Sequence, residues 1–164
     1  MPYEFYVTIQ GSKQGTLKGE PHSDNERPGQ KDKILGIRFF AETMIPFETA
    51  TGMASGKRQH KPILLTKRWG AASPQLFQAL VTNEVLTSVL FEFLQTDPQG
   101  QEFVFHTIKL TNAHISAIKS YLDLTDVTGD PYDGTELEDV SFVYQKIETE
   151  NKVGKTTAAD DWGR

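Results

Sequence analysis

The residues best suited to chemistry are the glycines and cations of segment 51–58, which reads Thr-Gly-Met-Ala-Ser-Gly-Lys-Arg. In phosphate-binding loops, backbone N–H groups between two glycines and a following lysine cradle the phosphates of a nucleotide. Such a loop needs four residues between its glycines and a hydroxyl side chain directly after the lysine. Here three residues separate Gly52 from Gly56, and Arg58 follows Lys57. The spacing therefore predicts no nucleotide site.

A second candidate is an acidic stretch near residue 130, because calcium is bound by several carboxylate oxygens from one flexible loop. Its members are Asp123, Asp126, Asp130, Asp133 and Glu136. Their spacing does not match the alternate-residue ligands of a calcium-binding EF-hand. We expect a solvated acidic loop over 125–135 and no metal site.

The remaining chemistry-bearing types show no recognised catalytic or metal-binding spacing. The four histidines, which are His22, His60, His106 and His114, lack the spacing of a zinc protease helix. A Gly-x-Ser-x-Gly nucleophile turn is missing, although a Ser-His-Asp triad is recognised by geometry and so stays open at this point. With no cysteine, thiolate catalysis and cysteine-based zinc sites are excluded. The sequence predicts a protein that is not an enzyme and that binds no cofactor or metal.

One basic run has the composition of a nucleic-acid contact, because cations beside an aromatic ring can follow a phosphate backbone. It comprises Lys57, Arg58, His60, Lys61, Lys67, Arg68 and Trp69. The net charge of −5 argues against this function. The charge is also uneven: residues 1–70 hold 11 Lys and Arg against 7 Asp and Glu, and residues 71–164 hold 6 against 15. If the two halves were separate in space, one copy would dock on the next head to tail; a barrel that interleaves them would remove this asymmetry.

The elements that must position these residues are predicted to be strands with one helix. Alternating or β-branched segments predict strands over 3–10, 34–42, 63–69, 85–96, 101–111, 115–124 and 140–147. Asp97-Pro98-Gln99-Gly100 fits a type I turn. Ser73 as N-cap and Pro74 at the first helical position predict the start of a helix, whose stripe of Leu76, Phe77, Leu80 and Val81 is expected to pack on the core. Many strands joined by turns favour an antiparallel barrel or sandwich.

Length and composition predict one domain over 1–164, because 37% hydrophobic content with 10 Phe and 2 Trp fills a sizeable core. We expect no membrane insertion, since no run of about 18 apolar residues is present. The N-terminus lacks the pattern of a signal peptide, which predicts folding in the cytoplasm. Residues 19–33 are predicted to form a surface loop and 151–164 a polar C-terminal tail.

The long segment 43–60 mixes Met, Ile and Phe with glycines and cations. Long loops in compact domains are usually functional or disordered, and its apolar residues argue against disorder. We expect a neighbouring subunit to cover these side chains.

Several motifs spread along the chain together resemble the hemolysin-coregulated protein (Hcp) family. The most specific are Gly56-Lys57-Arg58-Gln59-His60 and the run Ser-Pro-Gln-Leu-Phe-Gln-Ala-Leu over 73–80. The others are Tyr-Glu-Phe-Tyr-Val over 3–7, Leu-Thr-Asn-Ala over 110–113, Gln-Lys-Ile-Glu over 145–148 and the closing Asp160-Asp161-Trp162. The resemblance covers almost the whole chain.

The resemblance implies an antiparallel β-barrel of two sheets with one flanking α-helix. It implies homohexameric rings that stack as the inner tube of a bacterial type VI secretion system, a virulence machine with a spike protein and a contractile sheath. The tube would carry effector proteins in its lumen, first in the cytoplasm and then outside the cell or in a target cell. The family pattern makes 43–60 an extended assembly loop. The predicted subunit-interface residues are Met44, Pro46, Phe47, Met53, Lys57, Arg58 and His60.

The chain departs from familiar members in its charged 19–33 loop and at Thr149, where an aromatic residue often follows Gln-Lys-Ile-Glu. An alternative function is a monomeric ligand-binding barrel that uses Tyr6, Tyr121, Tyr132 and Tyr144. A nucleic-acid-binding barrel is the third hypothesis.

Overall fold

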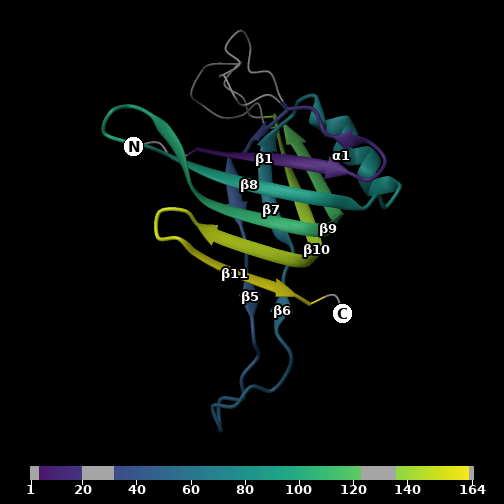
Figure 1. Ribbon diagram of the computed structural model, residues 1–164. Helices are drawn as coiled ribbons and strands as arrows, with labels where there is room; N and C mark the ends of the chain where they lie inside the picture. Colours follow the sequence, from purple (N-terminus) through teal and green to yellow (C-terminus); the bar gives the residue numbers. More distant parts are fainter. Residues whose placement is uncertain (1–3, 20–31, 123–135, 163–164) are drawn as a thin grey trace.

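The computed structural model describes residues 4–19, 32–122 and 136–162, which form an antiparallel β structure with one helix (Figure 1). In chain order the elements are β1 (Glu4–Gly11), β2 (Gly15–Thr16), β3 (Ile34–Leu35), β4 (Arg38–Phe40), β5 (Thr43–Met44), β6 (Gln59–His60), β7 (Ile63–Arg68), α1 (Ala72–Val81), β8 (Leu86–Thr96), β9 (Glu102–Leu122), β10 (Glu136–Asn151) and β11 (Thr156–Asp161). This confirms the predicted mainly β fold with one flanking helix.

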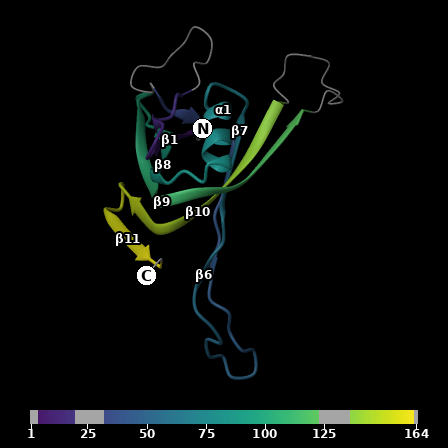
Figure 2. The ribbon, with the colours of Figure 1, turned by 90° about the vertical axis from the view of Figure 1, so that its right-hand side faces the viewer.

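The strands form one large antiparallel sheet in the order β2-β1-β8-β9-β10-β7-β4, with β5 and β6 paired separately. Strand β10 organises this sheet, because its 16 residues pair with β9 along one side and with β7 and then β11 along the other. Strand β9 carries one extra residue at two register shifts, Ser116 opposite Ser141/Phe142 of β10 and Phe105 opposite Phe93/Leu94 of β8, and such bulges bend the long strands. The sheet therefore curls over its own core (Figure 2).

The ladder does not close into a complete barrel within the described residues. Segment 34–40 instead passes from one side of the curled sheet to the other, since β3 pairs with β1 and β4 pairs with β7. The crossing point is Gly36, whose amide donates to the Phe5 carbonyl at 3.0 Å. A Cβ at this position would lie 2.0 Å from the Phe5 ring, so the close approach requires glycine.

The core lies inside the curl, with α1 covering one end of it. Alternation along β10 buries Glu138, Val140, Phe142 and Tyr144 and leaves the residues between them only partly covered. The helix adds Ala72, Leu76 and Ala79 to the same core. The period-2 pattern predicted for the strands is thus the pattern that fills the interior.

Three local predictions were wrong. The helix starts at Ala72 without a side-chain cap, because the Ser73 hydroxyl accepts from the Gly70 amide and donates to Glu138. Two members of the predicted core stripe, Phe77 and Val81, point outward and are 59% and 57% exposed. Residues 156–161 of the predicted polar tail form β11, which pairs with residues 146–151 of β10.

Two predicted strands, over 101–111 and 115–124, are parts of the single strand β9. The Asp97–Gly100 turn is confirmed, and its Gly100 amide donates to the Asp97 carbonyl at 2.9 Å. The 125–135 loop and most of the 19–33 loop lie outside the described residues.

Candidate assembly surface

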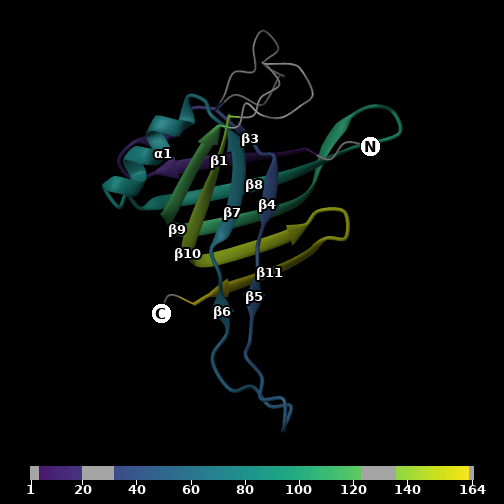
Figure 3. The same ribbon diagram turned by 180° about the vertical axis from the view of Figure 1, so that it is seen from behind.

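Residues 43–60, hereafter the extension, project from the body of the molecule as a narrow two-stranded arm (Figure 3). Strands β5 and β6 form its stalk. Beyond them, the Ser55 amide donates to the Pro46 carbonyl at 2.8 Å, and the Glu48 amide donates to the Met53 carbonyl at 2.8 Å. Gly52 turns the chain at φ +69°, a conformation that glycine adopts without steric cost. The backbone bonds give the arm a definite shape to its tip.

The extension exposes large apolar side chains along its length. Ile45 is 46% exposed, Phe47 59% and Met53 70%. The body of the molecule cannot cover them, because the arm stands away from it in every view (Figures 1 to 3). Clustered exposed apolar residues mark surfaces that meet a partner.

The base of the extension is fixed to β11 by a cluster that we call the clamp, formed by Arg58, His60, Tyr144, Asp160 and Trp162. The Asp160 Oδ2 atom accepts from the Arg58 Nε atom at 2.5 Å and lies 2.7 Å from the His60 Nε2 atom. The Tyr144 hydroxyl lies 3.2 Å from the His60 Nδ1 atom. The Trp162 ring stacks beside His60, with ring centroids 5.0 Å apart. The clamp joins two sequence motifs that are about a hundred residues apart.

Electrostatics in the clamp favour the charged form of its carboxylate. Hydrogen bonds from Arg58 and then from His60 lower the pKa of Asp160 below its ordinary value of 3.8. The same bond from Asp160 raises the pKa of Arg58. Burial raises the pKa of the Tyr144 hydroxyl, which therefore stays protonated. The clamp is therefore a charged contact at neutral pH.

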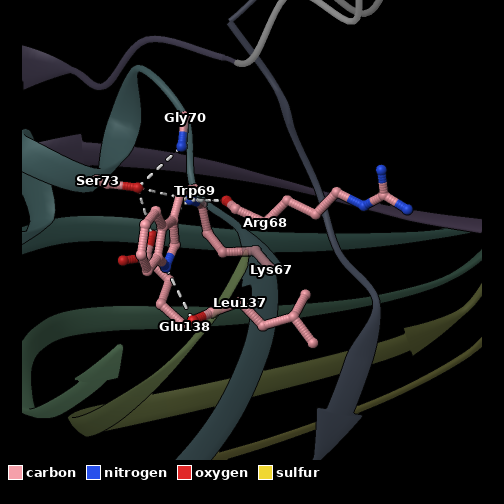
Figure 4. Close-up of polar contacts among 7 residues, drawn as sticks. All are labelled: Lys67, Arg68, Trp69, Gly70, Ser73, Leu137 and Glu138. Carbon is pink, nitrogen blue, oxygen red and sulfur yellow. Dashed lines mark hydrogen bonds and ion pairs between the residues drawn. The ribbon is translucent and has the colours of Figure 1, made fainter. Parts of the chain in front are cut away.

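The N-terminus of α1 is held by a buried polar network (Figure 4). The Lys67 Nζ atom donates to Glu138 Oε1 at 2.6 Å and to the Arg68 carbonyl at 2.7 Å, and lies 3.3 Å from the Ser73 hydroxyl. Lys67 is fully buried and Glu138 is 3% exposed. The Trp69 Nε1 atom donates to the Leu137 carbonyl at 2.9 Å. This network corrects the hypothesis of a continuous basic surface over 57–69, because its central lysine is internal.

The C-terminal end of α1 is held through Glu84, which is 2% exposed. Its Oε2 atom accepts from the backbone amides of Lys13 at 3.3 Å and Gln14 at 3.1 Å. The Gln14 amide side chain also donates to the Gln75 carbonyl at 3.0 Å. Both ends of the helix are thus tied to the sheet.

The other chemical hypotheses find little support in the geometry. The phosphate-loop-like segment 51–58 lies on the exposed arm. Among the described residues, no three His, Asp or Glu side chains are grouped to hold a metal ion. His106 lies 3.1 Å from the Thr149 hydroxyl, and His114 lines an open hollow beside Trp162.

The described tyrosines among those proposed for a ligand-binding barrel differ in their surroundings. Tyr6 and Tyr144 are buried at 7% and 5% exposure, and the Tyr121 hydroxyl donates to Asp139 at 3.3 Å. Tyr132 lies outside the described residues. One open hollow, with a volume of about 680 Å³, is lined by Tyr144 but not by Tyr6 or Tyr121.

The predicted interface residues divide into two groups. Phe47 and Met53 lie exposed on the outer part of the extension, with Met44 and Pro46 half-buried and Lys57 exposed. Arg58 and His60 belong to the clamp within the same chain. The sequence did not predict Tyr144 and Asp160 as partners of Arg58 and His60, although the motif Asp160-Asp161-Trp162 contains one of them.

The comparisons with known proteins agree with one another. The family model described as "Type VI secretion system effector, Hcp" matches residues 6–150. The chain is 33% identical over 162 residues to the "Major exported protein" of Pseudomonas aeruginosa, covering 96% of this chain and 94% of that protein. The chain belongs to the Hcp family. The resemblance inferred from its motifs is confirmed.

Solved Hcp structures share the fold. A crystal structure of an Hcp protein superposes with a TM-score of 0.89 at 28% identity, covering 98% of both chains. A secreted Hcp protein of Pseudomonas aeruginosa superposes with a TM-score of 0.79 at 31% identity, covering 98% of this chain and 99% of that one. The curled sheet with one helix is therefore the Hcp fold, and the chain is a type VI secretion system protein. In the described part of the chain, no helix is long and apolar enough to cross a membrane.

Proposed function

We propose that this chain is the structural subunit of the type VI secretion inner tube. Six copies close a ring, and rings stack into a tube inside the contractile sheath. The tube is assembled in the cytoplasm, is expelled with the spike protein and carries effector proteins in its lumen. Its role is mechanical, without catalysis.

The observation that carries this proposal is the extension. Its apolar side chains, Phe47 and Met53 above all, stand in solvent at the end of an arm whose base is clamped to the body. A fixed arm loses little conformational entropy on docking, which favours repeated contacts between copies. An arm that docks on a different patch of the next copy makes a heterologous contact, which generates rings or stacks.

The buried ionisable groups support a structural role. Within the described residues, Lys67, Glu138 and Glu84 are the buried charged side chains. Each is hydrogen-bonded to groups that position α1 or the turn after β1. These contacts use the charged groups for architecture rather than for a reacting substrate.

The test is light scattering coupled to size exclusion on the full chain, followed by negative-stain microscopy of the main peak. We expect a mass near six chains of 18.4 kDa each and ring-shaped particles. A monomer at every concentration, including the highest attainable, contradicts the proposal and favours the ligand-binding barrel.

A further inference from the structure

Helix α1 has an unusual surface for a helix on the outside of a protein. Residues 72–83 contain no Asp, Glu, Lys, Arg or His, in a chain in which 24% of residues are charged. A surface helix ordinarily carries charged residues on the face that meets water. The helix and the two residues that follow it have the composition of a segment covered on both sides.

Among the described residues, only one of these two sides is covered. Ala72, Leu76 and Ala79 face the core. Phe77 and Val81 stand on the outer side, one helical turn apart, and are 59% and 57% exposed. Residues four apart lie next to each other on a helix surface, so the two side chains form a continuous apolar patch.

This outer face is held rigidly from both ends. The Lys67, Ser73 and Glu138 network fixes the N-terminus (Figure 4), and the buried Glu84, three residues after the helix, accepts from the Gln14 amide at 3.1 Å. A surface whose backbone is fixed before contact pays less to bind than one that must first be ordered.

The tip of the extension matches this face in chemistry. Residues 49–56 hold no ionisable side chain, and Met53 at 70% exposure is the largest apolar group among them. The exposed Glu48 lies across the hairpin from Met53, with its amide donating to the Met53 carbonyl. A contact made through Met53 that leaves the Glu48 carboxylate in solvent at its rim buries no unpaired charge, which would be costly in an interface. Basic residues on the arm begin only at Lys57, after the tip.

The two surfaces lie at opposite ends of the molecule. In all three views the extension points away from the end that carries α1 (Figures 1 to 3). An arm with this direction cannot reach the helix of its own chain. Contact between the two surfaces therefore requires two copies.

We propose that the outer face of α1 is the docking site for the extension of a second copy of this chain. The inference rests on the proposed tube function and names the two surfaces that meet. Phe77 and Val81 form the receiving patch, with Gln78 between them, and Met53 and Phe47 supply the apolar side chains that enter. Each copy then gives one arm and receives one arm, as head-to-tail assembly requires.

One test uses a charge on the patch and a matched control. Val81→Asp puts a carboxylate at the centre of the docking face, whereas Val153→Asp puts it at a valine that is 65% exposed in the β10–β11 turn. We expect Val81→Asp to raise at least ten-fold the protein concentration needed for assembly, with unchanged circular dichroism, and Val153→Asp to assemble like the parent chain. Equal assembly of both variants contradicts the docking site.

A second test uses the absence of cysteine, which makes introduced thiols specific. The double variant Ala54→Cys with Gln78→Cys places one thiol at the tip and one on the outer face of α1, both at exposed positions. Under mild oxidation we expect a ladder of covalent multimers on a non-reducing gel. The control pair Ala54→Cys with Gln99→Cys, in the exposed β8–β9 turn, should give no ladder.

The outcomes separate the two proposals. If the parent chain forms rings but the Ala54 and Gln78 thiols give no more multimers than the control pair, the docking site is wrong and the tube function stands. If the parent chain is a monomer at every concentration, both proposals are wrong.

Discussion

At the scale of single residues, Lys67 shows how burial changes the meaning of a charge. In the sequence it belongs to a basic run with Arg58, Lys61 and Arg68, which favours a charged surface. In the structure it is fully buried on β7, and its ammonium group contacts Glu138 and the Arg68 carbonyl. Strand alternation places it there, since Ile63, Leu65 and Lys67 lie on the same buried face of β7. The network therefore belongs to the interior and anchors α1.

Removing this ammonium group should destabilise the fold strongly. Lys67→Met leaves Glu138 buried without its cationic partner, and breaking a buried pair in this way costs about 3–5 kcal/mol. Lys61→Met is the matched control, because its pair with Glu42 at 3.4 Å is solvent-exposed and such pairs contribute about 0–1 kcal/mol. Urea unfolding at one fixed protein concentration measures the free energy of unfolding of both variants. Equal losses of unfolding free energy would show that the buried network carries no special stability.

At the scale of elements, the clamp connects β11 to the base of the extension and so helps to fix its direction. Strand β11 pairs with β10 along six residues, and its Asp160 reaches across to the base of the arm. Among the described residues, the arm contacts the body through its stalk and the clamp, so its direction depends on this junction. The C-terminal strand thus takes part in assembly without lying at the tip.

The clamp should weaken in acid. Because the folded-state pKa of Asp160 is lowered, its stabilising contribution is complete above the ordinary pKa of 3.8 and is lost as pH falls through the lower folded value. In a Trp69→Phe background, the fluorescence of Trp162, which stacks on His60, should change over that range. The change should be missing in Asp160→Asn and retained in Glu150→Gln, a substitution on the neighbouring strand. The same transition in the Asp160→Asn protein would assign the pH response to another group.

Most strands could be predicted from the sequence, because alternation in β1, β8 and β10 follows directly from one buried face. The outward position of Phe77 could not be predicted, since helical spacing alone does not say which part of a wide apolar stripe faces the core. Strand β11 was equally hidden: its sequence Thr-Thr-Ala-Ala-Asp-Asp is polar and small, and it forms because β10 offers a free edge. Arg58 and His60 were singled out within a motif, but their partner Asp160 depended on that unpredicted strand.

At the scale of the whole molecule, the described strands from the basic and acidic halves of the sequence are not separated into two charged faces. Strands β1 and β7 from the basic half pair with β8 and β10 from the acidic half, so the fold interleaves them. A head-to-tail association driven by that asymmetry therefore has no structural basis. The features that do differ between the two ends of the molecule are apolar: the tip of the extension at one end and the outer face of α1 at the other (Figure 1).

Assembly should therefore depend on the apolar character of the tip. Met53→Asp places a carboxylate on a residue that is 70% exposed, so the isolated chain should keep its unfolding free energy within about 0.5 kcal/mol. In a ring or stack the same carboxylate would be buried without a partner. We expect each contact to lose at least about 2 kcal/mol of binding free energy, roughly a thirty-fold weakening, which is visible as a shift to monomer by light scattering.

The control variant Met53→Leu keeps an apolar side chain of similar volume and should assemble normally. Intact rings formed by Met53→Asp at the parent concentration would remove the tip from the interface and leave the stalk and α1 to account for assembly.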